Sequence, residues 1–260
     1  MRLEPTLQIR SDMQRCHFIS DNASCQYAAV STRPVRPAKR SEKAAPKARR
    51  YRGVDVGERV LERRRQFIAA GLECFGTRGY HAVTVRELCT EAQLTERYFY
   101  ESFADREALF AAVYEDLVEQ LRKDFTTAVL PKAPSLDEMA RAGLGAFFKG
   151  LQKDPRFGRI IMVEVLTVSI EMEQRAMRAT FAFADLIKQM ALATLPPGQR
   201  QKDAPDMDLV ATGLIGSCVH IAMRWIADGY HQPARTVIDT AMMFFAATTR
   251  YLGAKAPTSN

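Results

Sequence analysis

Apolar residues recur every three or four positions over most of the chain from residue 58 onward, with polar residues between them. This period predicts amphipathic α-helices. Proline, glycine and polar clusters separate the periodic stretches, as expected where helices end. We therefore predict an all-α fold of about nine helices, in which the longer helical stretches are Glu58–Arg78, Arg106–Val129, Ser135–Lys153, Pro155–Leu195 with a break around Leu166–Ser169, Met207–Asp228 and Pro233–Leu252.

Two short helices are predicted between the first two long ones. Thr84 directly precedes the helical run 85–92, and Glu87 stands three residues later, which completes a capping box. Thr95 is the expected N-cap of the second short helix. Two short helices joined by a tight turn are typical of a helix-turn-helix, whose second helix enters the DNA major groove.

The second short helix leaves a polar and aromatic face uncovered. Leu94, Phe99 and Phe103 can pack against the preceding helices, whereas the other side displays Thr95, Glu96, Arg97, Tyr98 and Tyr100. Asp105 then caps the next long helix, whose first N–H groups favour an anion such as a DNA phosphate. We expect this face to read DNA.

A dense run of motifs covers residues 64–117. RRRQFIAAGLECFGTRGY is followed by TVREL, LTERYFYESF and ADREALFAAV, which look like the first, second, recognition and fourth helices of the TetR family of bacterial transcriptional regulators. Tyr100 and Phe103 fall on that family's Tyr-x-x-Phe, and Arg106-Glu107-x-Leu109 on its basic-Glu-x-Leu. The resemblance implies an N-terminal three-helix DNA-binding domain, followed by an α-helical ligand-binding and dimerisation domain.

Two positions depart from the family pattern. Gln93 stands in the turn where the family carries a glycine, and a left-handed backbone there costs a non-glycine residue on the order of 1 kcal/mol. Gly71 stands inside the first helix where the family prefers alanine, which weakens the helix by roughly 0.5–1 kcal/mol unless close packing on another helix offsets it.

The residues of the reading face have different expected roles. Arg97 is the best candidate for reading a base, because a guanidinium can bond both acceptors of a guanine. We expect base or phosphate contacts from Thr95, Glu96 and Tyr98, and phosphate contacts that position the protein from Thr84, Tyr100 and Arg106. The alternatives are that either tyrosine packs on the first helix, and that Glu96 forms a salt bridge or repels wrong sequences.

The net charge of +7 is concentrated in the first 57 residues. Between Arg33 and Arg52 the chain has nine basic residues and one acidic residue among prolines and alanines, a composition that cannot build a core. Residues 1–57 are therefore predicted to be a basic, mostly disordered arm, with 58–105 the DNA-binding domain and 106–260 the effector-binding and dimerisation domain. Arg49, Arg50 and Arg52 would contact the DNA backbone or its minor groove; the alternative is a solvated extension or a wrongly chosen start.

The resemblance also implies a cavity for a small effector among the later helices. Methionine and aromatic side chains often line adaptable apolar cavities, and the candidates are Phe147, Met162, Val165, Leu166, Met172, His220, Met223 and Trp225. At helical spacing the same residues are ordinary core in the alternative interpretation. An apolar or aromatic effector is expected, with His220 or Arg224 orienting a polar group on it.

The last two predicted helices are apolar on more than one face and need partners on two sides. In the family that the chain resembles, these helices form a four-helix bundle with their copies across a two-fold axis. A two-fold homodimer reads two half-sites of a near-palindromic operator in double-stranded DNA. The expected function is a sequence-specific repressor that a small effector releases from its operator; the alternative is a constitutive or sequence-indifferent DNA-binding protein.

Other function classes lack support in the sequence. No nucleophile–base motif or glycine-rich phosphate loop points to an enzyme, and we expect no cofactor. The five cysteines and four histidines show no metal-ligand spacing. Cys74 and Cys89 are expected in the core, and Cys218 is the candidate if the chain is a thiol redox sensor. No signal peptide or membrane span is predicted, which indicates a cytoplasmic location.

Overall fold

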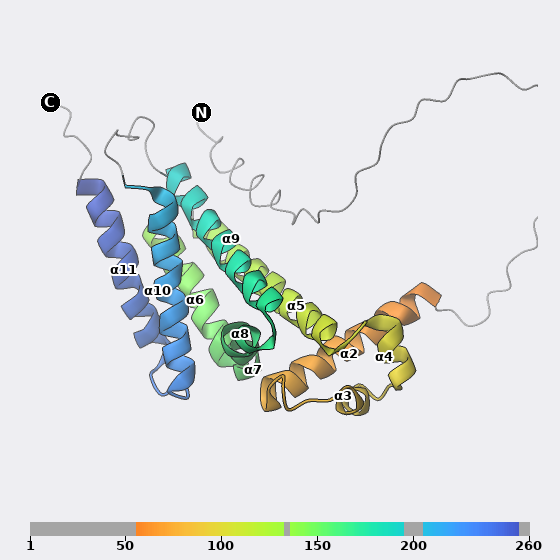
Figure 1. Ribbon diagram of the computed structural model, residues 1–260. Coiled ribbons are helices and arrows are strands. Elements are labelled where there is room, and N and C mark those ends of the chain that lie inside the picture. Colours follow the sequence, from red (N-terminus) through yellow and green to blue (C-terminus); the bar gives the residue numbers. More distant parts are fainter. Residues whose placement is uncertain (1–55, 133–135, 195–204, 255–260) are drawn as a thin grey trace, which may run out of the picture.

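The computed structural model describes residues 56–132, 136–194 and 205–254, and within these ranges the regular structure is entirely helical (Figure 1). The elements are α2 (Val56–Arg78), α3 (Val85–Glu91), α4 (Glu96–Ser102), α5 (Arg106–Val129), the 3-10 turn η1 (Leu130–Lys132), α6 (Leu136–Lys153), α7 (Pro155–Arg159), the π-helix η2 (Ile160–Glu164), α8 (Val165–Val168), α9 (Ile170–Thr194), α10 (Met207–Ala227) and α11 (Ala234–Ala254). The segment α7–η2–α8 is one uninterrupted helical run. The predicted all-α fold is confirmed.

The first three helices form a small unit at one end of the molecule, and α5 leads from it into the larger bundle (Figure 1). Phe67 of α2, Phe99 of α4 and Phe103 are all buried. The rings of Phe67 and Phe99 meet edge to face with centroids 5.4 Å apart, and Phe103 lies 6.3 Å from Phe67 in the same manner. The predicted burial of Phe99 and Phe103 is therefore confirmed, and these contacts hold α4 on α2.

Two of the three predicted N-cap hydrogen bonds are present. The Thr84 hydroxyl accepts from the Glu87 N–H, and the Glu87 carboxylate accepts from the Thr84 N–H at 2.8 Å, which completes the capping box of α3. Asp105 accepts from the Ala108 N–H at 2.7 Å and caps α5. Thr95 occupies the N-cap position of α4 with an extended backbone, as predicted. Its side chain makes no hydrogen bond to α4, so the expected capping bond is absent.

The turn between α3 and α4 has the left-handed conformation expected at Gln93, where φ is +54°. The Leu94 N–H donates to the Cys89 carbonyl at 3.0 Å across this turn. Because the N–H groups of Ala92, Gln93 and Leu94 all donate to carbonyls of α3, these hydrogen bonds offset the strain at Gln93 and the helix-turn-helix is kept.

Glycines bring α2 close to both of its neighbours. A Cβ on Gly71 would lie 2.8 Å from Cγ2 of Val113 on α5, so the close packing that could offset a helical glycine is present. A Cβ on Gly76 would lie only 2.4 Å from the Cβ of Arg156 on α7. The small N-terminal unit therefore packs on α5 along one side and on α7 along another.

The larger bundle contains α5, α6, α9, α10 and α11 (Figure 1). Helix α6 packs on α5 and α11, and α10 packs on α9 and α11. The predicted break before α9 is confirmed at Ser169, whose backbone is extended. Within the described residues, α10 is the one helix that is long and apolar enough to cross a membrane by length and composition. A single helix of this length and composition is weak evidence for a membrane span.

We predict that Gly76→Ala lowers the free energy of unfolding by about 1–3 kcal/mol, because the added methyl overlaps the Arg156 side chain where α2 meets α7. Gly145→Ala on α6 is the matched control, since its Cβ would meet no atom within 4 Å and helix propensity favours alanine. Urea unfolding of both variants is the measurement. Equal stability changes would show that the close approach at Gly76 is unimportant.

Candidate nucleic-acid interface and effector cavity

Helix α4 presents the outer face of the helix-turn-helix. Thr95, Glu96 and Tyr100 are exposed there, and the Arg97 side chain is 84% exposed. The Nε of Arg97 donates to Oε1 of Glu101 one turn later at 3.0 Å. An exposed i,i+4 ion pair contributes only about 0.3–0.5 kcal/mol, so the guanidinium is free to exchange this partner for a base edge.

Tyr98 occupies a different environment from Tyr100. The Arg63 guanidinium of α2 lies 4.4 Å from the centre of the Tyr98 ring, and Tyr98 is half-buried. The Tyr100 side chain is 59% exposed. The structure therefore places Tyr98 against the first helix, as in the alternative interpretation, and leaves Tyr100 free to reach DNA.

Arg106 supports the loop before α3, and its predicted phosphate contact remains a prediction. Its guanidinium lies 4.2 Å from the centre of the Tyr80 ring and donates to the Val83 carbonyl. The side chain is only half-exposed. Thr84 remains exposed, although its hydroxyl serves the capping box of α3.

The remaining predicted DNA contacts, Arg49, Arg50 and Arg52, lie outside the described residues. Arg64 of α2 was not singled out from the sequence. Its Nη1 donates to the Ser102 carbonyl at the end of α4 at 2.9 Å, and its guanidinium lies 4.3 Å from the Phe103 ring centre. Arg64 thus fixes the end of α4 to α2, a role that needs the three-dimensional contact to be recognised.

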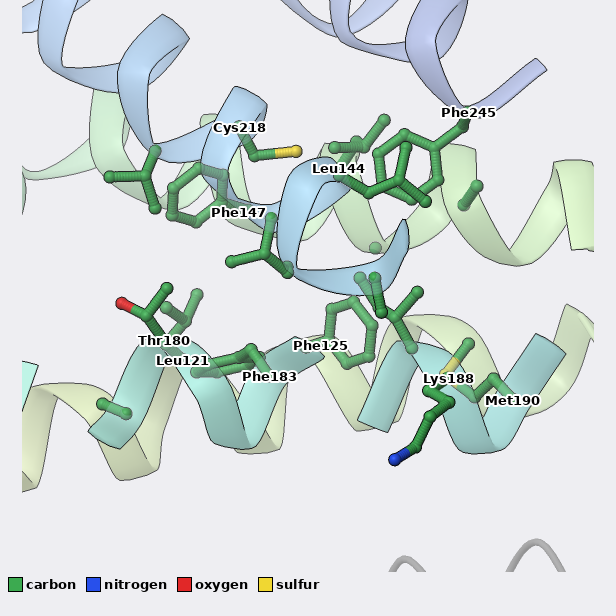
Figure 2. Close-up of a pocket in the computed structure, with 18 of the residues that line it drawn as sticks. Leu121, Phe125, Leu144, Phe147, Thr180, Phe183, Lys188, Met190, Cys218 and Phe245 are labelled. Carbon is green, nitrogen blue, oxygen red and sulfur yellow. The ribbon is translucent and has the colours of Figure 1, made fainter. Parts of the chain in front are cut away.

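A cavity of about 460 Å³ runs through the larger bundle, which is within the range of small-molecule sites. Its lining on α9 extends from Glu173 to Ala191, about 27 Å at the rise of an α-helix. Figure 2 shows Phe125 and Phe183 on one side of the space and Leu144, Phe147 and Cys218 on the other. The cavity is long and its lining is mainly apolar.

Three of the polar groups in the cavity lining are Tyr114, Cys218 and Lys188. Desolvation by burial raises the pKa of Tyr114 to about 12 and that of Cys218 to about 12, so both stay protonated near neutral pH. A thiol this buried is a poor redox sensor. Lys188 turns its ammonium away from the space (Figure 2) and pairs with Asp208 and with Asp185, the latter at 3.4 Å. Hydrogen bonding to Asp208 raises the pKa of Lys188.

Half of the predicted pocket residues line this cavity, namely Phe147, Met162, Leu166 and Met223. The other four lie outside this cavity. Val165, Met172 and Trp225 are buried in the continuous core, and the Trp225 indole N–H donates to the Gln232 carbonyl at 2.8 Å. His220 lies on the exposed face of α10, where its Nδ1 contacts the Gly216 carbonyl.

A buried carboxylate connects the loop after α2 to η2 of the larger domain. Glu164, the last residue of η2, is 8% exposed. It accepts from the Tyr80 N–H at 2.8 Å and from Nε of Arg159 at 2.9 Å. No local sequence signal marks this residue, because Tyr80 lies 84 positions earlier in the chain.

Comparison with known proteins identifies similar sequences and structures. The sequence model described as "Bacterial regulatory proteins, tetR family" matches residues 67–113. The HTH-type transcriptional activator FasR of Mycolicibacterium smegmatis is 26% identical over 165 residues, which cover 64% of this chain and 73% of that protein.

Solved structures show the same fold. The fatty acid degradation regulator FadR from Bacillus halodurans superimposes with a TM-score of 0.60 at 14% identity, over 70% of this chain and 93% of that chain. FadR from Bacillus subtilis in complex with stearoyl-CoA gives a TM-score of 0.59 at 15% identity, over 69% of this chain and 95% of that chain.

We predict that Arg97→Ala relaxes the sequence preference of DNA binding, since losing a bidentate contact to guanine removes about 1–3 kcal/mol of discrimination. A binding selection on random duplexes with the full chain is the measurement, and a two-fold symmetric motif should weaken at the position that Arg97 reads. Arg178→Ala on α9 is the control for lost positive charge, because it lies in the larger bundle. An unchanged motif with Arg97→Ala would remove this residue from the reading face.

Proposed function

This chain belongs to the TetR family of bacterial transcriptional regulators, and from that premise we propose that it is a homodimeric repressor released from its operator by a long-chain acyl effector. The elongated and mainly apolar lining of the cavity is the observation that carries the effector assignment. Residues 58–105 are proposed as the DNA-binding domain and 106–260 as the effector and dimer domain. The protein is proposed to act in the cytoplasm, where bacterial DNA is located.

DNA recognition is proposed to centre on α4. Arg97 reads a base from its exposed position, and Thr95, Glu96 and Tyr100 lie on the same helix or at its start. Thr84 stands at the N-terminus of α3, where it can approach a phosphate. We further propose that the basic stretch before residue 57 adds non-specific attraction through phosphate neutralisation.

Dimerisation is proposed through the outward faces of α10 and α11. Leu209, Gly213, Gly216 and His220 form one stripe along α10 at successive helical turns. The Leu209 side chain is 70% exposed, and on α11 Met243 is 69% exposed. A Cβ at either stripe glycine would meet nothing within 4 Å. An apolar face with such open positions suits the close approach of a second copy.

We predict that Gly213→Arg weakens the homodimer by roughly 3–5 kcal/mol, the cost of burying an unpaired charge in the interface. The folded protomer has room for the new side chain because no atom lies within 4 Å of the Cβ position. Gly150→Arg on α6 is the matched control, since it is equally open. Sedimentation equilibrium should show the first variant dissociating at concentrations where wild type and control remain dimeric; an intact Gly213→Arg dimer would place the interface elsewhere.

The effector is proposed to be a long acyl chain held along α9. A chain of methylene groups gains about 0.8 kcal/mol for each group buried, and it can follow a space bounded by Leu121, Phe125, Phe147 and Phe183. The similar FadR from Bacillus subtilis was crystallised in complex with stearoyl-CoA. This supports an acyl effector for the present chain.

Release is proposed to occur by a population shift. The effector favours a geometry in which the two recognition helices are wrongly spaced for the operator, so its differential affinity for the two states sets the extent of release. Affinity for the operator then falls as the cavity fills.

We predict that Ala179→Phe abolishes acyl binding while the helix-turn-helix remains folded, because Ala179 lines the cavity and a phenyl ring would occupy it. Ala182→Phe on the same helix is the matched control, since Ala182 is exposed and outside the lining. Stearoyl-CoA should raise the melting temperature of wild type and control and release them from the selected operator, and should do neither for Ala179→Phe. Wild-type protein that keeps the operator and shows no thermal shift would favour a constitutive DNA-binding protein.

A further inference from the structure

Glu164 is the only charged side chain that is buried among the described residues. Both of its carboxylate oxygens are used: Oε2 accepts from the Tyr80 N–H at 2.8 Å, and Oε1 accepts from Arg159 at 2.9 Å. A buried carboxylate without partners would be strongly destabilising. Its position therefore depends on both halves of the molecule keeping their present arrangement.

Glu164 does not line the cavity itself, but three residues close to it in sequence do. Ile161 and Met162 precede it in η2, Leu166 follows it in α8, and all three line the cavity. A π-helix has wider turns than an α-helix, because its hydrogen bonds join residues five apart instead of four. Single π-helical turns often occur at functional sites. If a ligand in the cavity displaces the side chains of Ile161 and Met162, the displacement acts directly on the backbone of η2, which also carries Glu164.

The group that Glu164 holds leads straight to the DNA-reading helices. Gly79 has φ of +89°, and a Cβ there would lie 3.0 Å from Oε1 of Glu164, so the backbone approaches the carboxylate as closely as glycine allows. The Tyr80 ring is fixed by Phe110 at 5.4 Å between centroids and by the Arg106 guanidinium. The loop then runs to Thr84, which caps α3.

We propose that Glu164 is the positioning residue that couples the state of the cavity to the orientation of α3 and α4. With the cavity empty, its carboxylate holds the Tyr80 N–H and the operator-binding arrangement. A chain pressing on Ile161 and Met162 moves η2, and the Glu164–Tyr80 hydrogen bond is lost. This inference rests on the proposed function, because it names the regulation of the same cavity.

Three other hydrogen bonds join the same surfaces. Arg156 donates to Glu73 of α2 at 2.5 Å, and Arg159 also donates to the Thr77 carbonyl at 2.6 Å. His81 lies 2.9 Å from the Thr167 carbonyl through its Nε2. Since the Arg156–Glu73 pair starts from α7, which contributes no residue to the cavity lining, it provides the control for a purely structural contact.

The test is the ratio of operator dissociation constants with and without saturating stearoyl-CoA, measured for wild type, Glu164→Gln and Glu73→Gln. The amide of Glu164→Gln keeps the size of the side chain but can no longer accept from Arg159 and Tyr80 as a charged group. We expect a ratio of about 5–150 for wild type, typical of coupled sites, a similar ratio for Glu73→Gln, and less than a twofold effect for Glu164→Gln.

A merely structural role for Glu164 would weaken operator binding equally with and without stearoyl-CoA, leave the ratio unchanged and overturn the inference. A wild-type ratio of one would instead overturn the proposed acyl effector. Hydrogen exchange of the wild-type protein tests whether the Glu164–Tyr80 hydrogen bond is lost, and it does not depend on how well Glu164→Gln folds. Stearoyl-CoA should speed exchange of the Tyr80 amide relative to the Phe103 amide, which donates within the helix-turn-helix to Phe99; unchanged Tyr80 exchange would contradict the proposal.

Discussion

Tyr80 lies where three parts of the molecule meet. Its ring packs on Phe75 of α2 and Phe110 of α5, with centroids 5.7 and 5.4 Å away, and its N–H donates to Glu164 of η2. The Arg106 guanidinium covers the same ring. Since interiors are close-packed and respond to displacement by switching between arrangements, α3 and α4 cannot tilt relative to the bundle without disturbing these contacts. The position of the DNA-reading face therefore depends on this loop.

The cavity is a gap in an otherwise continuous apolar interior. Its wall includes Leu121, Leu144 and Phe245 of the main core, and also Met139 and Met190 of a separate cluster toward the far end of the bundle. Empty apolar volume costs stability because the lining lacks contacts on one side. An acyl chain would supply those contacts and join the two clusters. The van der Waals contacts that would bind the effector are therefore those that the cavity lining lacks when the cavity is empty.

Local patterns in the sequence predicted what depends on residues near one another. The capping box of Thr84 and Glu87, the left-handed turn at Gln93 and the packing of Phe99 and Phe103 follow from spacing and backbone chemistry. Helical periodicity cannot tell a cavity wall from a filled core, which is why Met162 lines the cavity whereas Trp225, chosen by the same criterion, packs against Phe148 and Tyr230. The Tyr80–Glu164 contact spans 84 positions and only the folded chain brings it together.

We propose that the operator and the acyl effector compete through the conformation of one protein, so that each weakens the binding of the other by the same factor. Calorimetric titration of stearoyl-CoA into the free protein and into the operator-saturated protein is the measurement. Competition predicts that stearoyl-CoA binds the operator complex more weakly, by the same factor by which stearoyl-CoA weakens operator binding. Equal affinities for the two forms would show that the cavity and the DNA-reading face are independent.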